Sequence, residues 1–267
     1  MYLLSSTKVR IGWVLLVVRI IQELNMFGVS NVGVIPTKVP ATSAGQIVFN
    51  TSGTTNWTVP AGVTSICCVC VQANGDAAAT TVTVNSVMVC RALNNNRIGD
   101  GGGNGGAGGS VFYDGFYYGG GSGGAGGYSG NGGAGGGGGD PFSGGGSGQA
   151  GAGGAGGGGG CGSAGSTNAG AGGGVGLLGT GTSGGSTGAF GGTGKPGSGG
   201  VGSQYGGGLA TGSATSSGRT GGALSYKNNI SVTPGSTVVI SIGASNGAVR
   251  IIWGPGRAYP STNTGNV

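Results

Sequence analysis

The sequence predicts an all-β, sandwich-like platform that carries an inserted lattice of polyglycine-II helices. Residues 99–222 contain 62 glycines among 124 residues, whereas the rest of the chain holds only 13 of the 75 glycines. The other residues of this block often recur at every third position, and runs rich in Val, Ile and Thr flank it on both sides. We therefore predict a platform formed by 46–98 and 223–267, a glycine-rich lattice with loops over 99–222, and an N-terminal docking segment and linker over 1–45.

The three-residue period distinguishes the glycine block from an ordinary linker. Gly-Gly pairs separate the members of two series: Asn104, Ala107 and Ser110, and then Ser122, Ala125, Tyr128, Asn131 and Ala134. A left-handed polyproline-II-type helix turns once every three residues and has no internal hydrogen bonds, so its backbone must bond to water or to neighbouring segments. Such neighbours come close enough only where no Cβ intervenes. A flexible Gly/Ser linker is the alternative that composition alone favours.

Short strands are predicted on either side of the block, because its flanks have the β-branched residues and turn spacing of an all-β unit. The predicted strands are 46–49, 63–71, 80–84, 86–90, 223–232, 236–242 and 248–253. Residues 51–56 are expected to form a polar turn, and Asn85 to lie at the turn of a hairpin. Trp57 and Trp253 are expected to be core residues of the platform and not ligand contacts.

The first 25 residues differ in composition from the remainder. Residues 11–18 are mainly apolar, but Arg10 and Arg19 bound this run, which is far shorter than the ~20 residues that span a bilayer. No small-residue cleavage site follows it, as a signal peptide requires. Two interpretations remain open. Residues 8–24 form a short amphipathic docking helix, or the natural protein begins at Met26 and the preceding residues result from a start codon assigned too far upstream.

Catalytic side chains are scarce in this sequence. It has no histidine, and its five acidic residues are not paired at any short spacing that general acid–base chemistry uses. The 11 basic residues give a net charge of +6 but form no cluster with interleaved aromatic residues, which is the footprint of nucleic-acid binding. We therefore expect neither an enzyme nor a nucleic-acid-binding protein, and we expect no cofactor.

Three cysteines lie in the apolar run 66–71, which is typical of a strand. Alternation along a strand places Cys68 and Cys70 on one face and Cys67 on the other. Because the sequence has no histidine, no metal site is predicted, and the thiols are expected to act as small buried apolar groups. The sequence leaves open whether Cys90 approaches this strand or forms a disulfide. The odd total of five cysteines suggests folding in a reducing cytoplasm.

Aromatic residues are concentrated at one interruption of the glycine block, 111–118. Tyrosine offers a large rigid contact area with a polar tip, and the surrounding Gly, Ser and Asn offer adaptable hydrogen bonding, a mixture typical of binding loops. Two weaker candidates lie at other interruptions. The predicted receptor-binding residues are Phe112, Tyr113, Asp114, Phe116, Tyr117, Tyr118, Phe142 and Tyr205. The alternative is that the rings of 111–118 fold back and cover the glycine block or the platform.

Both flanks contain motifs that resemble phage sequences. The run 57–65, Trp-Thr-Val-Pro-Ala-Gly-Val-Thr-Ser, resembles the opening of glycine-rich domain proteins that are common among tailed-phage virion genes. The run 247–263, from Gly-Ala-Val-Arg-Ile-Ile-Trp to Pro-Ser-Thr-Asn, is similar to the ending of many structural proteins of marine T4-like and cyanobacterial phages. The block itself resembles the polyglycine sandwich of T-even-type distal tail-fibre adhesins. The present flanks do not match the attachment domain of those adhesins.

The resemblance implies a virion surface protein, made in the host bacterial cytoplasm and located at a tail fibre or tail tip. Loops on the glycine lattice would then bind a receptor on the host surface, a glycan or an outer-membrane protein. Other virion structural proteins, and further copies of the chain in a homo-oligomer, are the implied partners. A capsid decoration or another purely structural virion role is the alternative. A cell-wall or fibre-forming glycine-rich protein is a third hypothesis, but it would have repeats that reach the termini.

Overall fold

The computed structural model describes residues 43–73, 78–113, 116–119, 121–135, 172–179, 205–206, 219–244 and 246–267. All of them belong to one unit, Thr42–Val267. The predicted N-terminal helix, over 8–24, lies outside the described residues. Among those residues the helical structure is a single 3-10 turn, η1 (Thr262–Thr264). No helix in this part of the chain has the length and apolar character needed to cross a membrane.

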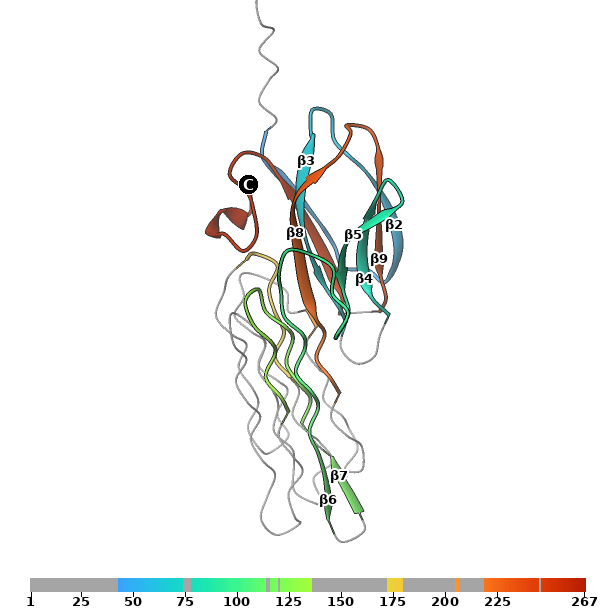
Figure 1. The fold of residues 1–267 in the computed structure, drawn as a ribbon, viewed down its shortest axis with the longest axis vertical. Helices are drawn as coiled ribbons and strands as arrows, with labels where there is room; N and C mark the ends of the chain where they lie inside the picture. Colours follow the sequence, from blue (N-terminus) through green and yellow to red (C-terminus); the bar gives the residue numbers. More distant parts are fainter. Residues whose placement is uncertain are drawn as a thin grey trace, which may run out of the picture. The chain divides into compact units, whose positions relative to one another are not determined.

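Two four-stranded antiparallel sheets form the platform of the described structure (Figure 1). Sheet 1 contains, in spatial order, β1 (Gly45–Phe49), β10 (Ala248–Trp253), β3 (Ser65–Val71) and β8 (Leu224–Ser231). Sheet 2 contains β2 (Gly53–Thr58), β9 (Thr237–Ile242), β4 (Thr80–Val84) and β5 (Val87–Ala92). A separate two-stranded sheet pairs β6 (Ser110–Tyr113) with β7 (Phe116–Gly119). Sheets 1 and 2 each combine strands from both flanks of the glycine block, and the all-β prediction is confirmed.

One apolar cluster lies between sheets 1 and 2. Alternate residues of each strand contribute to it, because successive side chains of a strand lie on opposite faces. Its most deeply buried members include Cys68, Val82, Ile240, Val249 and Ile251. The rings of Trp57 and Trp253 pack at 5.7 Å between centroids, Trp57 as a member of the cluster and Trp253 against it. Both tryptophans are therefore packing residues of the platform, as predicted.

The opposite face of sheet 1 is buried as well. Cys67, Val69 and Val71 of β3 belong to a second apolar cluster, which also contains Tyr128 and Leu177 of the glycine block. A strand that is covered on both faces needs side chains suited to burial at consecutive positions. This explains why β3 is apolar without interruption and why β10 is buried along almost its whole length.

The strand predictions are right at most positions and wrong at one. Asn85 and Ser86 have φ values of 49° and 63°, the left-handed pair that a two-residue type I′ hairpin turn requires, and they join β4 to β5 as predicted. The polar turn predicted over 51–56 is wrong, because β2 begins at Gly53 and pairs with β9 up to Thr58. As an edge strand that is exposed except at Trp57, β2 is held by its backbone pairing and needs few apolar residues.

Candidate functional site

Segment 121–127 of the glycine block bonds to several neighbouring segments at once. Three successive amides donate in three different directions: Gly123 N to Arg219 O (2.8 Å), Gly124 N to Gly133 O (2.9 Å) and Ala125 N to Gly173 O (2.9 Å). The next amide, Gly126 N, returns to the first neighbour and donates to Gly222 O (2.9 Å). The bonding direction thus repeats after three residues, whereas the side chains and ladder of a β-strand repeat after two.

Two other contacts between glycine-rich segments show the same period. In each contact the two donor residues are three positions apart, and so are the two acceptor residues. The segments run antiparallel in the first contact and parallel in the second. The bonds are Gly106 N to Gly124 O and Gly109 N to Gly121 O, then Gly132 N to Asn104 O and Gly135 N to Ala107 O, each 2.8 Å long. Segment 101–109 is bonded on a third side too, because Gly221 N donates to Gly106 O (2.9 Å).

Glycine is required at the positions between these bonded segments. An ideal Cβ on Gly105 would lie 1.8 Å from Gly221 O, and one on Gly106 would lie 1.9 Å from Gly133 O. Both distances are far inside van der Waals contact, and the obstacle in each case is backbone. At third positions the environment differs: Ala107 is exposed, while Tyr128 is buried against sheet 1. A third environment is that of Ser122, which is buried and accepts a hydrogen bond from Arg219 N (3.1 Å) of a neighbouring glycine-rich segment.

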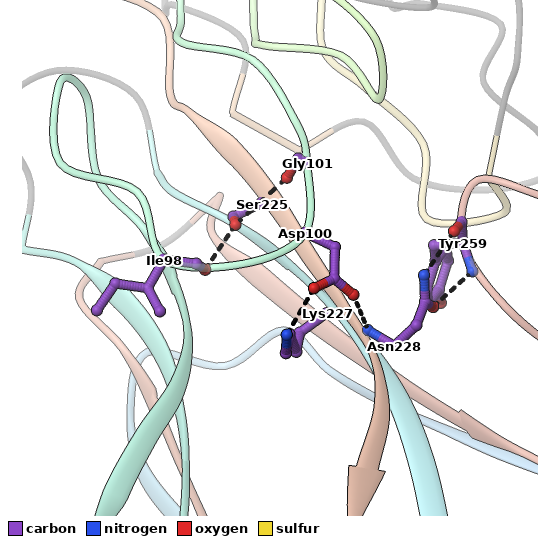
Figure 2. Close-up of polar contacts among 7 residues, drawn as sticks. All are labelled: Ile98, Asp100, Gly101, Ser225, Lys227, Asn228 and Tyr259. Atoms are coloured by element: carbon purple, nitrogen blue, oxygen red, sulfur yellow. Dashed lines mark hydrogen bonds and ion pairs between the residues drawn. The ribbon is translucent and has the colours of Figure 1, made fainter.

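The start of the glycine block is fastened to β8 (Figure 2). Asp100 accepts hydrogen bonds at its carboxylate from Lys227 Nζ (2.6 Å) and Asn228 N (2.8 Å), and its own amide donates to Tyr226 O (2.7 Å). Burial by itself would raise the pKa of Asp100, but these hydrogen bonds and the Lys227 charge outweigh it and lower that pKa below its usual value. Ser225 Oγ donates to Ile98 O (2.7 Å), so the segment is held before and after Asp100.

Three tyrosines from distant parts of the sequence pack together on the face of sheet 1 that is turned away from sheet 2. Tyr128 comes from the glycine block, Tyr226 from β8 and Tyr259 from the C-terminal segment. Tyr128 and Tyr259 are nearly parallel at 5.9 Å between centroids, and Tyr226 lies 6.1 Å from Tyr128. The Tyr128 hydroxyl donates to Gly176 O (2.9 Å), which joins a further glycine-rich segment. Burial raises the pKa of Tyr128 and of Tyr259.

Arg250, which the sequence does not predict as a site residue, is buried where the glycine block meets sheet 1. Arg250 of β10 is 1% exposed and points to the same face of sheet 1 as the tyrosines. Its guanidinium donates to Leu177 O (3.1 Å), Gln46 Oε1 (3.1 Å) and Gly265 O (3.2 Å). Arg250 therefore ties the glycine block, β1 and the C-terminal segment to one strand. The sequence signal is an arginine inside the run Ala-Val-Arg-Ile-Ile-Trp, where a charged residue must find polar partners if the strand is buried.

Most of the predicted receptor-binding residues lie on one hairpin. β6 and β7 pair so that Val111 is opposite Tyr118, Phe112 opposite Tyr117, and Tyr113 opposite Phe116. Asp114, at the connection between the two strands, lies outside the described residues. The prediction placed these residues on a loop, whereas the backbone forms two short paired strands. Segment 101–109 leads into β6, and β7 leads back towards segment 121–127. The hydrogen bond from Gly109 N to Gly121 O joins the two segments next to the hairpin, which lies at the end of the block away from β8 (Figure 1).

The two remaining predicted contact residues do not join the hairpin. Tyr205 is 8% exposed, belongs to the second apolar cluster and pairs through its backbone with Val175. Its hydroxyl accepts a hydrogen bond from Asn50 Nδ2 (3.5 Å). This packing keeps the ring away from the surface, and we leave Tyr205 out of the proposed contact residues. Phe142 lies outside the described residues.

The four described cysteines are buried free thiols that divide between the two clusters. Cys68 and Cys70 lie in the cluster between the sheets and Cys67 in the second one, as the strand alternation predicted. Cys90 of β5 does approach β3, because its Sγ atom lies within 4.8 Å of those of Cys68 and Cys70. Burial raises the pKa of the Cys70 thiol well above its ordinary value.

Comparison of this chain with protein-family models, with curated proteins and with solved structures finds no match in any of the three.

Proposed function

We propose that this chain is a phage virion structural protein, a tail-fibre or tail-tip adhesin that binds the bacterial host surface through side chains carried on a polyglycine-II lattice. The observation that carries this proposal is the position of the aromatic hairpin β6–β7. It continues two glycine-rich segments whose hydrogen bonds fix them laterally, and the first of them is fastened to β8 at its other end.

The lattice is proposed for the whole of 99–222. The three-residue repeat of bonding in segments 101–109, 121–127 and 130–135 supports it, since a polyproline-II-type helix turns once in three residues. Bonding on three sides also compensates the large loss of backbone entropy that ordering glycine involves. Such a lattice would hold the hairpin in a fixed position and orientation relative to the platform.

The contact surface is proposed to be Phe112, Tyr113, Asp114, Phe116, Tyr117 and Tyr118. Five aromatic residues on one short hairpin provide a large contact area at low cost in side-chain entropy. The proposed receptor is a glycan or an outer-membrane protein of the host. The platform would dock to other virion proteins or to further copies of the chain, in agreement with the phage-like motifs at 57–65 and 247–263. The role is binding and requires neither a catalytic group nor a cofactor.

The test is adsorption of purified, fluorescently labelled protein to a panel of marine cyanobacterial strains. A variant with Tyr113→Ala, Tyr117→Ala and Tyr118→Ala should lose at least ten-fold in affinity for any strain that the parent protein binds. Val87→Ala, on β5 of the platform, is the matched control, because Val87 is 62% exposed and distant in sequence from the hairpin. Unchanged binding by the triple variant would disprove the hairpin as contact surface.

The position in the virion provides the second test. Antibody labelling of phage particles should mark the tail fibres or the tail tip. Labelling of the capsid would instead support the decoration hypothesis and would overturn the adhesin.

A further inference from the structure

We propose that Cys68, Cys70 and Cys90 form a three-sulfur site for the soft cation Cu(I), enclosed between the two sheets. This site is independent of the proposed adhesin function. Cys68 and Cys70 lie two positions apart on β3 of sheet 1, and Cys90 lies on β5 of sheet 2. Their three Sγ atoms are all within 4.8 Å of one another, and all three residues are fully buried.

The sulfur atoms face one another across the sandwich. Cys90 Sγ, from sheet 2, also donates a hydrogen bond to Ser225 O (3.5 Å) on β8 of sheet 1. With metal–sulfur bonds of about 2.3 Å, three sulfurs around one ion lie roughly 4 Å apart. The observed spacing is therefore close to that of a trigonal site, and small side-chain rotations would complete it.

The donor set selects the ion. Among the described residues this group of possible ligands contains three thiols and no histidine or carboxylate, and thiolates prefer Cu(I) to hard ions such as Mg²⁺ or Ca²⁺. Zinc is nearly always four-coordinate, with water often as the fourth ligand. Because all three cysteines are fully buried, solvent has no direct approach to a fourth position. Three sulfurs in an apolar enclosure suit Cu(I) better than Zn²⁺.

Binding of Cu(I) to the three thiols needs no oxidant or reductant. Each thiol that becomes a thiolate ligand exchanges its S–H bond for an S–Cu bond, and its proton passes to the solvent. Copper and sulfur keep their oxidation states. The bound state then carries negative charge, and Lys227 of β8, whose ammonium pairs with Asp100, lies opposite Cys68 in the register of sheet 1.

Full burial also determines how the site is loaded. With no sulfur exposed, the ion must enter before sheets 1 and 2 close on each other. Copper should therefore be taken up during folding and retained afterwards, even against a strong chelator. It would then link β3 and β5, which belong to different sheets.

The experiment is anaerobic refolding of the full chain with Cu(I)–acetonitrile, followed by removal of loose copper with bathocuproine disulfonate. The expected result is about one copper ion per chain, a sulfur-to-copper charge-transfer band and a higher urea midpoint than that of the copper-free protein. Cys90→Val keeps an apolar side chain in the core and should lose the retained copper and the band. Cys67→Ala, on the opposite face of the same strand, should keep both.

Circular dichroism establishes that both variants fold before copper is measured. Equal copper retention by the parent and Cys90→Val, or retention of no copper by the folded parent, would overturn the proposal. Parallel refolding with Zn²⁺ should give no ion that survives chelation, and stable zinc would refute the choice of Cu(I). A disulfide among the three cysteines in protein purified under reducing conditions would also refute it.

Discussion

The sandwich and the glycine block of this chain are both densely packed, but they achieve density by opposite means. Between the sheets, Ile251 and its neighbours fill the space with branched side chains. In the glycine block, segments approach until backbone carbonyls occupy the place of a Cβ, as at Gly106. The first region depends on the volume of its side chains and the second on their absence. Mutations should therefore have opposite size preferences in the two regions.

The two modes meet on the outer face of sheet 1. Among the described residues, Tyr128 and Leu177 of the block belong to the same apolar cluster as residues of β3. Hydrogen bonds of Asp100 and Arg250 also join the block to the platform. This contact, called the seam below, thus adds side-chain burial to hydrogen bonds, whereas the glycine-rich segments beside it are joined mainly by backbone hydrogen bonds. Four substitutions, taken in order of expected effect, test this division.

Removal of volume should be most damaging in the sandwich. Ile251→Ala empties a fully buried position between the sheets and should lower the free energy of unfolding by about 3.5 kcal/mol. Val87→Ala, at an exposed position of β5, should change it by less than about 0.5 kcal/mol. Urea unfolding followed by tryptophan fluorescence measures both, since Trp57 and Trp253 lie at this core. Similar losses for the two variants would contradict the packing described for the sandwich.

Addition of volume should be most damaging in the glycine block. Gly106→Ala places a methyl group 1.9 Å from Gly133 O, so bonded segments must separate, at a cost of about 3 kcal/mol. Gly265→Ala is the control, because its Cβ would meet nothing within 4 Å and its φ is −53°. Amide hydrogen exchange should show protection lost in 101–109 and 130–135 only for Gly106→Ala. Protection as low in the parent chain as in an unstructured peptide would remove the basis of the lattice.

The tyrosine stack should make the seam sensitive to alkali. Burial raises the pKa of Tyr128 in the folded state, so its contribution to stability is complete below the unfolded value of about 10 and is lost as pH rises through the folded value. Tyr128→Phe loses the hydrogen bond to Gly176 O, at a cost of about 1 kcal/mol at neutral pH. It should also reduce the fall in stability between pH 8 and pH 11 in urea titrations. An unchanged alkaline slope would show that this hydroxyl is not buried as described.

Loss of the ion pair between Asp100 and Lys227 should have the smallest effect on stability. This ion pair is partly exposed, with 40% and 36% of the two side chains accessible, so Asp100→Asn should cost less than about 1 kcal/mol. The folded-state pKa of Asp100 is lowered, so this contribution is present above about pH 4 and disappears as pH falls through the folded value. The difference between parent and variant should therefore vanish in acid. Asp100→Ala, which also removes the acceptor for Asn228 N, should cost more than Asp100→Asn, and equal costs would argue against that hydrogen bond.

Local patterns predicted much of the platform. The hairpin at Asn85, the strand 248–253 and the opposite facing of Cys67 and Cys68 follow from turn chemistry and alternation within a few residues. The edge strand β2 did not follow, because its polar sequence becomes a strand only through pairing with β9, which comes from the far side of the glycine block.

Less of the candidate site than of the platform could be predicted from the sequence. Tyr117 and Tyr205 both follow polar or aromatic neighbours in a glycine-rich context, yet one lies on the hairpin and the other is buried against sheet 1. The aromatic run 112–118 sets Tyr117 apart from the isolated Tyr205, but no local signal predicts the burial of Tyr205, because that burial depends on which segment crosses sheet 1. The proximity of Cys90 to β3 likewise depends on how the sheets stack.

The glycine block leaves the platform and returns to it at almost the same point. Gly101 and Tyr226 pair, and Leu224 N donates to Gly103 O (2.9 Å), so the first residues of the block lie beside β8, the strand that begins two residues after the block ends. Changes in length confined to the far end of the block would leave this junction in place. We therefore expect the end of the block that carries β6 and β7 to tolerate insertions and deletions better than the residues that pack on sheet 1.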